Sequence, residues 1–457
     1  MLQSFFLIGK TGEVLIEKHW REVTPRSVCD YFWDEVNKYE SRDEMPPVVH
    51  TTKYYLVSIY REDMFFLGTT IVETNPLGVI EFLHRMFDTF ENYFGEVCES
   101  NIKDNFSTVY QLLEEMMDFG YALTTEPNAL KLMIKPPSVL ARVANALGRG
   151  SSQVSDELAE GTISNMPWRM TNVIHTQNEI YLDIIEEVDS ILSVNGIIVS
   201  SEATGVILGN SKLSGVPDLA LHFNDPGIID DCSFHPCVRY TRYERDSIVS
   251  FVPPDGAFEL MKYRISSDAL RGHIIAPCYC QPTVSYDYDG KKGEINLICG
   301  LRSTSSLLFP SKGGQGAGGG GVDLVEDVVV EIPFSRTVRT TNLEVDTGTV
   351  LYDESTKVAR WNVGKLTGDK QPRLKGTMIL QHVSPNTNKH ASKNPTAVNS
   401  NSDEIVDSPP IRMHWKVPMA SLSGLSVSSL QLFNEDYKPY KGVRTIAKSG
   451  KFQIRTI

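Results

Sequence analysis

The first 120 residues alternate between strand-like and helix-like patterns of apolar positions. Short apolar runs at 5–8 and 14–16 flank Lys10-Thr11-Gly12, which predicts two strands joined by a turn. Two further β-rich runs, 54–60 and 64–71, lie on either side of residues 61–63 and predict a hairpin. These runs together predict the sheet of one compact α/β domain.

Apolar positions three and four residues apart predict three helices on that sheet. The first follows Thr24-Pro25, where a hydroxyl can cap the helix and proline can take its first position. The second begins at Asn75-Pro76, and the third ends at Gly120. Their apolar faces fit packing on the sheet, and binding of a partner is the alternative. The faces consist of Val28, Tyr31, Phe32, Val36, Val79, Leu83, Met86, Phe87, Phe90, Phe94, Phe106, Val109, Tyr110, Leu113, Met116 and Met117.

The pattern changes after residue 135. Residues 136–168 begin with two prolines, continue as a short basic and apolar stretch that closes at Gly148, and then become rich in serine and acidic residues. Such a segment is typical of a linker with one short helix, and phosphorylation of its hydroxyl groups is the alternative use. We therefore expect two folded bodies joined by this segment.

From residue 169 onward the chain is dominated by short strand signals. At 261–265, for example, apolar residues alternate with Lys262 and Arg264. Two low-complexity stretches, 313–321 and 386–401, read as surface loops. The predicted organisation is multidomain, α/β followed by all-β. It consists of an α/β domain at 1–135, a linker at 136–168, and a β-sandwich at 169–457 that is large enough for two sub-sandwiches.

Composition and charge exclude several classes of protein. The 457 residues are 41% hydrophobic and 22% charged, as in soluble globular proteins, and the net charge of −13 argues against a nucleic-acid partner. Residues 1–130 hold 10 basic and 22 acidic residues, so most of the negative charge belongs to the α/β domain. No apolar run is long enough to predict a membrane span or a signal peptide. Seven cysteines without framework spacing fit a reducing compartment, which indicates a cytosolic protein.

The sequence shows no motif for catalysis, for a cofactor or for a metal. The glycine tract at 313–321 lacks the Lys and the helix of a P-loop, and no Gly-x-Ser-x-Gly or His-Glu-x-x-His occurs. One cluster invites a zinc interpretation but lacks paired Cys-x2-4-Cys spacing, so packing between strands is favoured. Its members are Cys232, His235, Cys237, Cys278 and Cys280. We therefore expect a protein that is not an enzyme and has no cofactor or metal.

The C-terminal end is basic in an acidic protein. From Lys438 onward there are six basic residues and no acidic one, and Arg444 is among them. Residues 441–446 alternate like a strand near the surface, which predicts an edge strand. Solvated charge is the simple explanation of this run, and recognition of a ligand is the alternative.

Several longer motifs resemble one known family. Residues 229–239 (IDDCSFHPCVR), 250–264 (SFVPPDGAFELMKYR) and 213–218 (LSGVPD) closely resemble the medium (mu) subunits of clathrin-adaptor complexes. Residues 167–169 (PWR), 361–365 (WNVGK) and the tail at 437–455 resemble in particular the mu subunits of the third adaptor complex. The resemblance covers essentially the whole chain. It implies a longin-like N-terminal domain, a linker and a C-terminal mu-homology domain.

The resemblance also implies a function. Medium subunits of this family select cargo for vesicle coats by binding Tyr-x-x-Φ sorting signals, where Φ is a bulky apolar residue, in the cytosolic tails of membrane proteins. The implied partners are two large and one small adaptor subunit, with peripheral association to Golgi, endosomal and coated-vesicle membranes and transport to the lysosome or vacuole. The alternative is a medium chain of another adaptor or coatomer-like complex that acts structurally without binding tyrosine signals.

The resemblance implies a peptide site made of six residues. Asp183 would accept a hydrogen bond from the hydroxyl of the signal tyrosine, Arg444 would lie against its ring, and Tyr181 would line the same pocket. Leu182, Val427 and Leu430 would line the pocket for Φ. Two positions depart from the plasma-membrane relative, because Asn210 stands in place of a lysine and Gly442 in place of a tryptophan. We expect these changes to weaken the site or to alter its selectivity.

Overall fold

The computed structural model describes residues 2–39, 41–137, 166–170, 172–270, 272–287, 291–302, 324–335, 337–368, 371–380 and 409–456. The chain divides into two compact units, Met1–Val173 and Ile174–Ile457. The predicted linker helix and both low-complexity stretches fall outside the described residues. No helix among those described is both long enough and apolar enough to cross a membrane.

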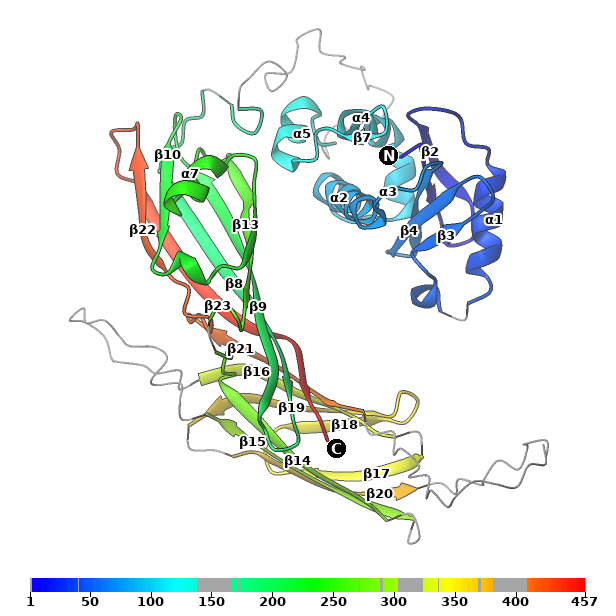
Figure 1. The fold of residues 1–457 in the computed structure, drawn as a ribbon, viewed down its shortest axis with the longest axis vertical. Coiled ribbons are helices and arrows are strands. Elements are labelled where there is room, and N and C mark those ends of the chain that lie inside the picture. Colours follow the sequence, from blue (N-terminus) through cyan, green and yellow to red (C-terminus); the bar gives the residue numbers. More distant parts are fainter. Residues whose placement is uncertain are drawn as a thin grey trace, which may run out of the picture. The chain divides into compact units, whose positions relative to one another are not determined.

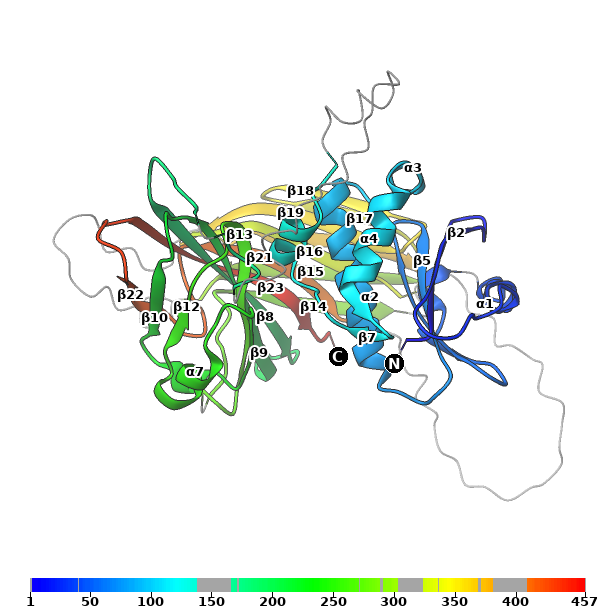
Figure 2. The same cartoon turned by 90° about the horizontal axis from the view of Figure 1, so that it is seen from above.

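A five-stranded sheet with the order β2-β1-β5-β4-β3 forms the centre of the N-terminal unit. Helix α1 covers one face, while α2 and α4 cover the other (Figure 2). The strands are β1 (Ser4–Ile8), β2 (Val14–His19), β3 (Val48–His50), β4 (Tyr55–Arg61) and β5 (Met64–Thr70), and a short pair follows at β6 (Met117–Asp118) and β7 (Tyr121–Ala122). The helices are α1 (Ser27–Val36), α2 (Pro76–Phe94), α3 (Glu99–Asp104), α4 (Phe106–Met116) and α5 (Pro127–Met133), with a 3-10 turn η1 (Arg42–Glu44).

Both predicted strand pairs and the predicted start of α2 are confirmed. β4 and β5 pair across the two-residue turn Glu62-Asp63, which has φ of 47° and 59° and therefore matches the twist of the strands. The side chain of Asn75 accepts a hydrogen bond from the amide of Leu77 at 3.1 Å. This bond satisfies one of the unpaired amides at the start of α2.

Other details of the predicted helices were wrong. Thr24 does not cap α1, because its hydroxyl is bonded to Ser4 at 2.7 Å inside the sheet, and the N-cap residue is Arg26. Tyr31 is 41% exposed, so it lies outside the packed face of its helix. The third helix ends at Met116 instead of Gly120, and its Phe106 is 59% exposed. The short helices α3 and α5 had no clear periodic signal and were missed.

The C-terminal unit is built almost wholly of strands, as expected. A nine-stranded sheet has the order β11-β13-β9-β8-β23-β21-β16-β19-β18, and sheets of three strands (β12-β10-β22) and four strands (β14-β15-β20-β17) accompany it. Strands β8, β9 and β23 run from the part that holds β10, β22 and α7 toward the part that holds β14–β20 (Figure 1). The multidomain fold class, α/β followed by an elongated β-sandwich, is confirmed.

The bounds of these elements are as follows. The nine-stranded sheet contains β8 (Glu179–Leu192), β9 (Ile198–Lys212), β11 (Asp231–Phe234), β13 (Gly256–Ser266), β16 (Leu324–Pro333), β18 (Thr349–Asp353), β19 (Val358–Thr367), β21 (Ile411–Pro418) and β23 (Tyr440–Ile454). The three-stranded sheet contains β10 (Asp218–Phe223), β12 (Val249–Phe251) and β22 (Val427–Phe433). The four-stranded sheet contains β14 (Cys278–Asp287), β15 (Lys292–Leu301), β17 (Val338–Val345) and β20 (Arg373–Leu380), and α7 (Tyr240–Asp246) and a 3-10 turn η3 (Pro226–Ile228) lie in connections.

A row of three residues crosses the inner face of the large sheet. Gly205 on β9 pairs with Tyr263 on β13 and with Glu186 on β8. Because glycine has no side chain, the tyrosine ring lies across it, and its hydroxyl donates to the Glu186 carboxylate at 3.2 Å. Burial and the neighbouring carboxylate raise the pKa of Tyr263, so the hydroxyl keeps its proton and remains a donor. This row ties three strands together beneath the candidate site.

Candidate functional site

The candidate residues of the tyrosine pocket meet where β8 and β23 run side by side. The two strands pair in parallel, with Tyr181 opposite Gly442 and Asp183 opposite Arg444. Side chains alternate along a strand, so Tyr181 and Asp183 project to the outer face of the sheet and Leu182 to the inner face. Burial agrees with this alternation, because Tyr181 is 41% exposed and Leu182 is fully buried.

Asp183 and Arg444 form a two-pronged ion pair. The Nε of Arg444 donates to one carboxylate oxygen at 3.0 Å, and its Nη2 donates to the other at 2.6 Å. Their side chains remain 35% and 59% exposed. The hydrogen bonds, followed by the charge of the carboxylate, raise the pKa of Arg444. The pair is thus ordered and open to solvent, and its carboxylate oxygens can accept further hydrogen bonds.

Tyr181 lies over a strand position that has no side chain. A Cβ on Gly442 would lie 2.6 Å from Cδ1 of Tyr181, so only glycine leaves room for this ring. The ring also contacts Tyr440, with a centroid distance of 5.6 Å. Its hydroxyl donates to Glu179 at 3.2 Å, and partial desolvation followed by that carboxylate raises the pKa of Tyr181. The two tyrosine rings fill the outer face where the sequence departs from the plasma-membrane relative.

The second departure lies on the neighbouring strand. Asn210 on β9 pairs with Tyr181 and is exposed on the same outer face. The lysine of this strand stands two residues further on, at Lys212, where its Nζ donates to Glu179 at 2.9 Å. The positive charge on β9 therefore lies beside Glu179 and Tyr181, and Asn210 presents a neutral amide opposite Tyr181.

Leu182 lies on the inner face of the nine-stranded sheet, whereas the other two candidate apolar residues lie on the three-stranded sheet. Val427 and Leu430 belong to β22 and are half-buried. The Nζ of Lys441 donates to the carbonyl oxygen of Leu430 at 2.7 Å, which brings β22 next to β23. Val443 pairs with Leu182, faces the same side and is 43% exposed. The sequence reasoning missed Val443, although alternation from Arg444 could have placed it beside the apolar group.

The start of β23 has one open side. Tyr440 to Thr445 pair with β8, whereas pairing with β21 begins only at Ile446 among the described residues. The amide of Tyr440 donates to the carbonyl of Asn178 on the β8 side. By alternation, the amides and carbonyls of Lys441, Val443 and Thr445 point to the open side. The predicted edge strand at 441–446 is therefore confirmed for 441–445, whereas Ile446 and the rest of β23 lie inside the sheet.

The cysteine and histidine cluster serves the packing of the unit. The Nδ1 of His235 accepts a hydrogen bond from the amide of Cys237 at 2.9 Å. Cys278 and Cys280 are buried on β14, and burial raises the pKa of Cys278. Within the described residues, no group of three or more His, Cys, Asp or Glu side chains is placed to hold a metal ion.

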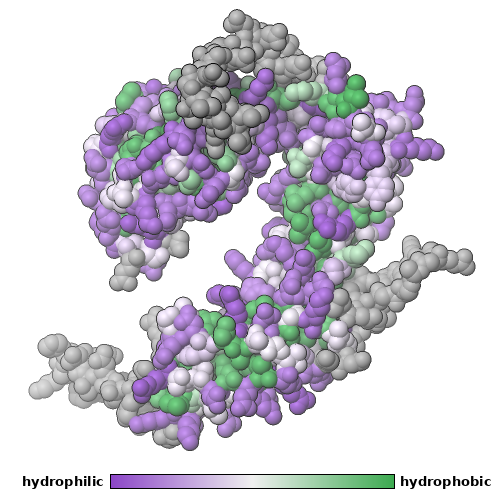
Figure 3. Space-filling view, turned by 180° about the vertical axis from the view of Figure 1, so that it is seen from behind, coloured by the Kyte–Doolittle hydropathy of each residue, from purple (hydrophilic) through white to green (hydrophobic). Residues whose placement is uncertain are grey.

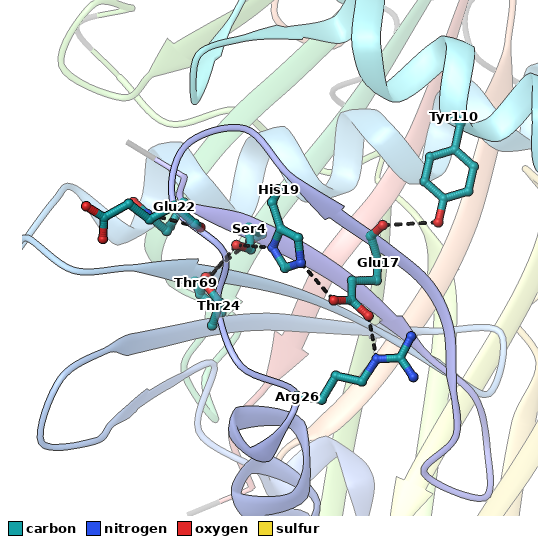
Figure 4. Close-up of polar contacts among 9 residues, drawn as sticks. Ser4, Glu17, His19, Glu22, Thr24, Arg26, Thr69 and Tyr110 are labelled. Carbon is teal, nitrogen blue, oxygen red and sulfur yellow. Dashed lines mark hydrogen bonds and ion pairs between the residues drawn. The ribbon is translucent and has the colours of Figure 1, made fainter.

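One arrangement in the N-terminal unit has the outline of a catalytic triad. His19 bonds Ser4 at 2.7 Å through Nδ1 and Glu17 at 2.7 Å through Nε2 (Figure 4). Catalysis would need an accessible nucleophile, but Ser4 is fully buried and its hydroxyl also contacts Thr24. Glu17 additionally accepts from Arg26 at 2.5 Å. The network therefore joins β1, β2 and the segment before α1, and it has a structural role.

Two family comparisons cover nearly the whole chain. Residues 166–456 match the adaptor complexes medium subunit family, and residues 1–135 match the clathrin adaptor complex small chain family. The fold expected from the resemblance, a longin-like domain and a mu-homology domain, is therefore confirmed.

Individual relatives match from end to end. The chain is 42% identical over 461 residues to the AP-3 complex subunit mu of Dictyostelium discoideum, covering 100% of both chains. It is 41% identical over 456 residues to the AP-3 complex subunit mu-1 of Homo sapiens, again covering 100% of both. A homology model of the full-length AP-3 complex in an intermediate open conformation matches with a TM-score of 0.56 at 16% identity, covering 100% of both chains, which supports the fold alone.

Proposed function

Because this chain belongs to the adaptor complexes medium subunit family, we propose that it selects membrane cargo by binding Tyr-x-x-Φ signals beside the start of β23. The family is one of adaptor subunits and not of enzymes. The observation that carries the proposal is the exposed Asp183–Arg444 pair next to a strand with one open side. We further assign 1–135 to the longin-like domain, 136–168 to the linker and 169–457 to the mu-homology domain.

The open side of β23 suits an extended peptide. A peptide that adds as a further strand gains backbone hydrogen bonds from Lys441, Val443 and Thr445, and its side chains alternate between the two faces. Tyr and Φ are three positions apart, so their side chains project to opposite faces of the added strand. The polar pair lies on the outer face and the apolar group near Leu182 on the inner face. The spacing of the signal thus matches the division of the site.

Each polar residue has a distinct role toward the signal tyrosine. Asp183 accepts the hydroxyl hydrogen, and this charge-assisted bond leaves the ion pair with Arg444 intact because a carboxylate has several acceptor positions. Arg444 lies against the ring and adds a cation–π attraction. Tyr181 bounds the pocket through its ring. A phosphate on the signal tyrosine would bring its negative charge onto Asp183, so phosphorylation should abolish binding.

The apolar end of the signal reaches the inner face. Leu182, Val427 and Leu430 line the Φ pocket in this proposal, with Val443 as a fourth contact. Burial of a leucine side chain stabilises the complex by about 2 kcal/mol when it is complete. The pocket selects for size and hydrophobicity, because it presents few polar groups to the ligand.

A signal of four residues makes a small contact, so its affinity should be weak, on the order of micromolar. Assembly with two large and one small adaptor subunit, together with peripheral attachment to the membrane, supplies avidity. The named relatives are subunits of AP-3 complexes. By that relationship we propose that the chain works in a heterotetramer on the cytosolic side of Golgi, endosomal and coated-vesicle membranes. Its cargo would then travel to the lysosome or vacuole.

The second candidate is a medium chain that acts structurally and binds no tyrosine signal. The contact of Tyr181 with Tyr440 above Gly442 favours this alternative, because the two rings occupy the outer face beside the proposed pocket. In that case Asp183 and Arg444 would be an ordinary surface ion pair.

Isothermal titration of the full chain separates the two candidates. The ligands are a ten-residue peptide with one Tyr-x-x-Leu signal, its Tyr→Ala version and its phosphotyrosine version, and the protein variant is Asp183→Ala. The proposal expects binding heat for the unmodified signal with the unmodified protein, and none for the two altered peptides or for Asp183→Ala. A matched control, Asp230→Ala, removes another exposed strand-edge ion pair, that with Arg264, and should bind normally. Equal heats for all peptides would sink the proposal and favour the structural role.

A further inference from the structure

A buried carboxylate lies on β8 three residues beyond Asp183. Glu186 is fully buried and is in no ion pair among the described residues. A buried charge of this kind is tolerated only when hydrogen bonds satisfy it. Its Oε1 accepts from Tyr263 Oη at 3.2 Å, Ser421 Oγ at 2.9 Å and Ser423 Oγ at 2.6 Å, and its Oε2 accepts from the amides of Leu422 at 2.9 Å and Ser423 at 3.3 Å.

Most of these donors belong to one connection. Residues 419–426 join β21 of the nine-stranded sheet to β22 of the three-stranded sheet. The connection also folds on itself, because Ser421 Oγ accepts from the amide of Gly424 and Ser423 Oγ accepts from that of Leu425, both at 3.1 Å. It therefore closes around the carboxylate and is held at a fixed point on β8.

The connection leads directly into one wall of the proposed Φ pocket. Val427 follows its last residue, and Leu430 lies three residues further along β22. Leu182, on the opposite wall, lies on β8 and faces inward like Glu186. We propose that Glu186 is a positioning residue that sets the distance between β22 and β8 and thereby the shape of the Φ pocket. This inference rests on the proposed function.

Other contacts also hold β22, among them a bond from the amide of Asn224 to the carbonyl of Ser426 at 2.9 Å. β10 pairs with it from Asp218 to Phe223, and Lys441 bonds the carbonyl of Leu430. The pairing with β10 fixes β22 within its own small sheet, and the lysine is a single exposed side chain. Glu186 instead joins the start of β22 to the strand that carries Leu182. Its removal should therefore affect recognition of Φ more than recognition of tyrosine.

The test replaces Glu186 in the full chain and measures two ratios of affinity. One ratio compares peptides ending in Leu and in Ala at Φ, and the other compares Tyr with Phe at the first position. In Glu186→Gln the side-chain NH2 group is a donor and faces hydroxyl and amide donors of the connection, so some of the hydrogen bonds that hold the connection are lost. We expect the Leu/Ala ratio to fall from about tenfold to about twofold. The Tyr/Phe ratio, which depends on Asp183, should stay unchanged.

Matched variants separate positioning from general instability. Asp189→Asn makes the same change on the same strand, but Asp189 bonds the backbone of Lys451 on the outer face, so both ratios should stay unchanged. Ser423→Ala removes one donor from the loop and should act like a milder Glu186→Gln, and it serves if the glutamine variant fails to fold. Unchanged ratios in both Glu186→Gln and Ser423→Ala would overturn the inference while leaving the proposed function intact. An equal fall of both ratios would overturn it as well.

A measurement without peptide distinguishes failure of the inference from failure of the function. Hydrogen exchange at the amides of Leu422 and Ser423 and along β22 should accelerate in Glu186→Gln, because these amides lose their acceptor or their support. If the unmodified chain binds no signal peptide, the proposed function and the Φ role fail together, and faster exchange would show that the anchor itself is real. Unchanged exchange in β22 would refute the anchor.

Discussion

Replacing Gly205 by alanine tests the packing of the Tyr263 ring over Gly205, which places the tyrosine hydroxyl beside Glu186. The added Cβ would lie 2.0 Å from Cζ of the tyrosine and 2.4 Å from its Oη, whereas ordinary contacts are 3.4–4 Å. Tyr263 is only 3% exposed, so its ring cannot move away without displacing its neighbours. The substitution should therefore push the ring off the row and break the bond to Glu186.

The expected cost follows from two effects. Overpacking of a well-filled interior costs about 1–3 kcal/mol. Loss of one donor to a buried carboxylate costs about 1–3 kcal/mol, although the Ser421 and Ser423 donors remain. We therefore expect Gly205→Ala to lower the free energy of unfolding of the C-terminal unit by about 2–6 kcal/mol.

Urea unfolding followed by tryptophan fluorescence measures this cost, because Trp361 and Trp415 are buried in the C-terminal unit. The control is Gly368→Ala, where nothing lies within 4 Å of the added Cβ, and it should change stability by less than about 0.5 kcal/mol. In a Tyr263→Ala background, Gly205→Ala should cost far less, because the ring is gone. An equal cost in both backgrounds, or no cost beyond the control, would refute the reasoning.

Three further predictions concern the outer face and one turn. Asp183→Asn should remove the preference for a Tyr over a Phe peptide in titration. It should leave the unfolding midpoint unchanged, because the ion pair is exposed. A shifted midpoint with the preference retained would contradict this. Gly442→Ala should displace the Tyr181 ring and weaken peptide binding by at least about threefold, and unchanged affinity would count against the pocket. Hydrogen bonds from Ser355 hold the pKa of Asp353 at about 2, so Asp353→Ala should lower Tm at pH 6, and the gap should close as pH falls from about 4 toward 2. A gap that does not shrink between about pH 4 and pH 2 would contradict this sign.

Local periodicity was sufficient for much of the fold. The 3.6-residue spacing located α2, and alternation located β13, because each pattern reflects burial of one face. The cap of α1 could not be foreseen, since the hydroxyl of Thr24 bonds Ser4, which is twenty residues away in sequence. Phe106 and Tyr31 fit an apolar stripe but lie at its rim, where propensity alone does not decide exposure. Apolar side chains remain at the surface of the other unit as well. Seen from behind, the C-terminal unit shows apolar patches among polar surface (Figure 3).

Part of the candidate site could likewise be predicted from the sequence, and part could not. The resemblance implied Asp183 and Arg444, and the pairing of β8 with β23 gives them a common face although 261 residues separate them. The anchoring role of Glu186 had no sequence signal, because it depends on a connection more than 230 residues away. The match of Gly205 to Tyr263 likewise depends on the register between β9 and β13. Long-range register of this kind is not encoded in any short window of sequence.

Hydrogen exchange of the full chain with and without a Tyr-x-x-Leu peptide tests the central proposal most directly. If the peptide adds as a strand to the open side of β23, amides in residues 441–445 should exchange more slowly in its presence. The Tyr→Ala peptide at the same concentration should give no such protection. Unchanged exchange at 441–445 under conditions where the peptide is bound would contradict the account.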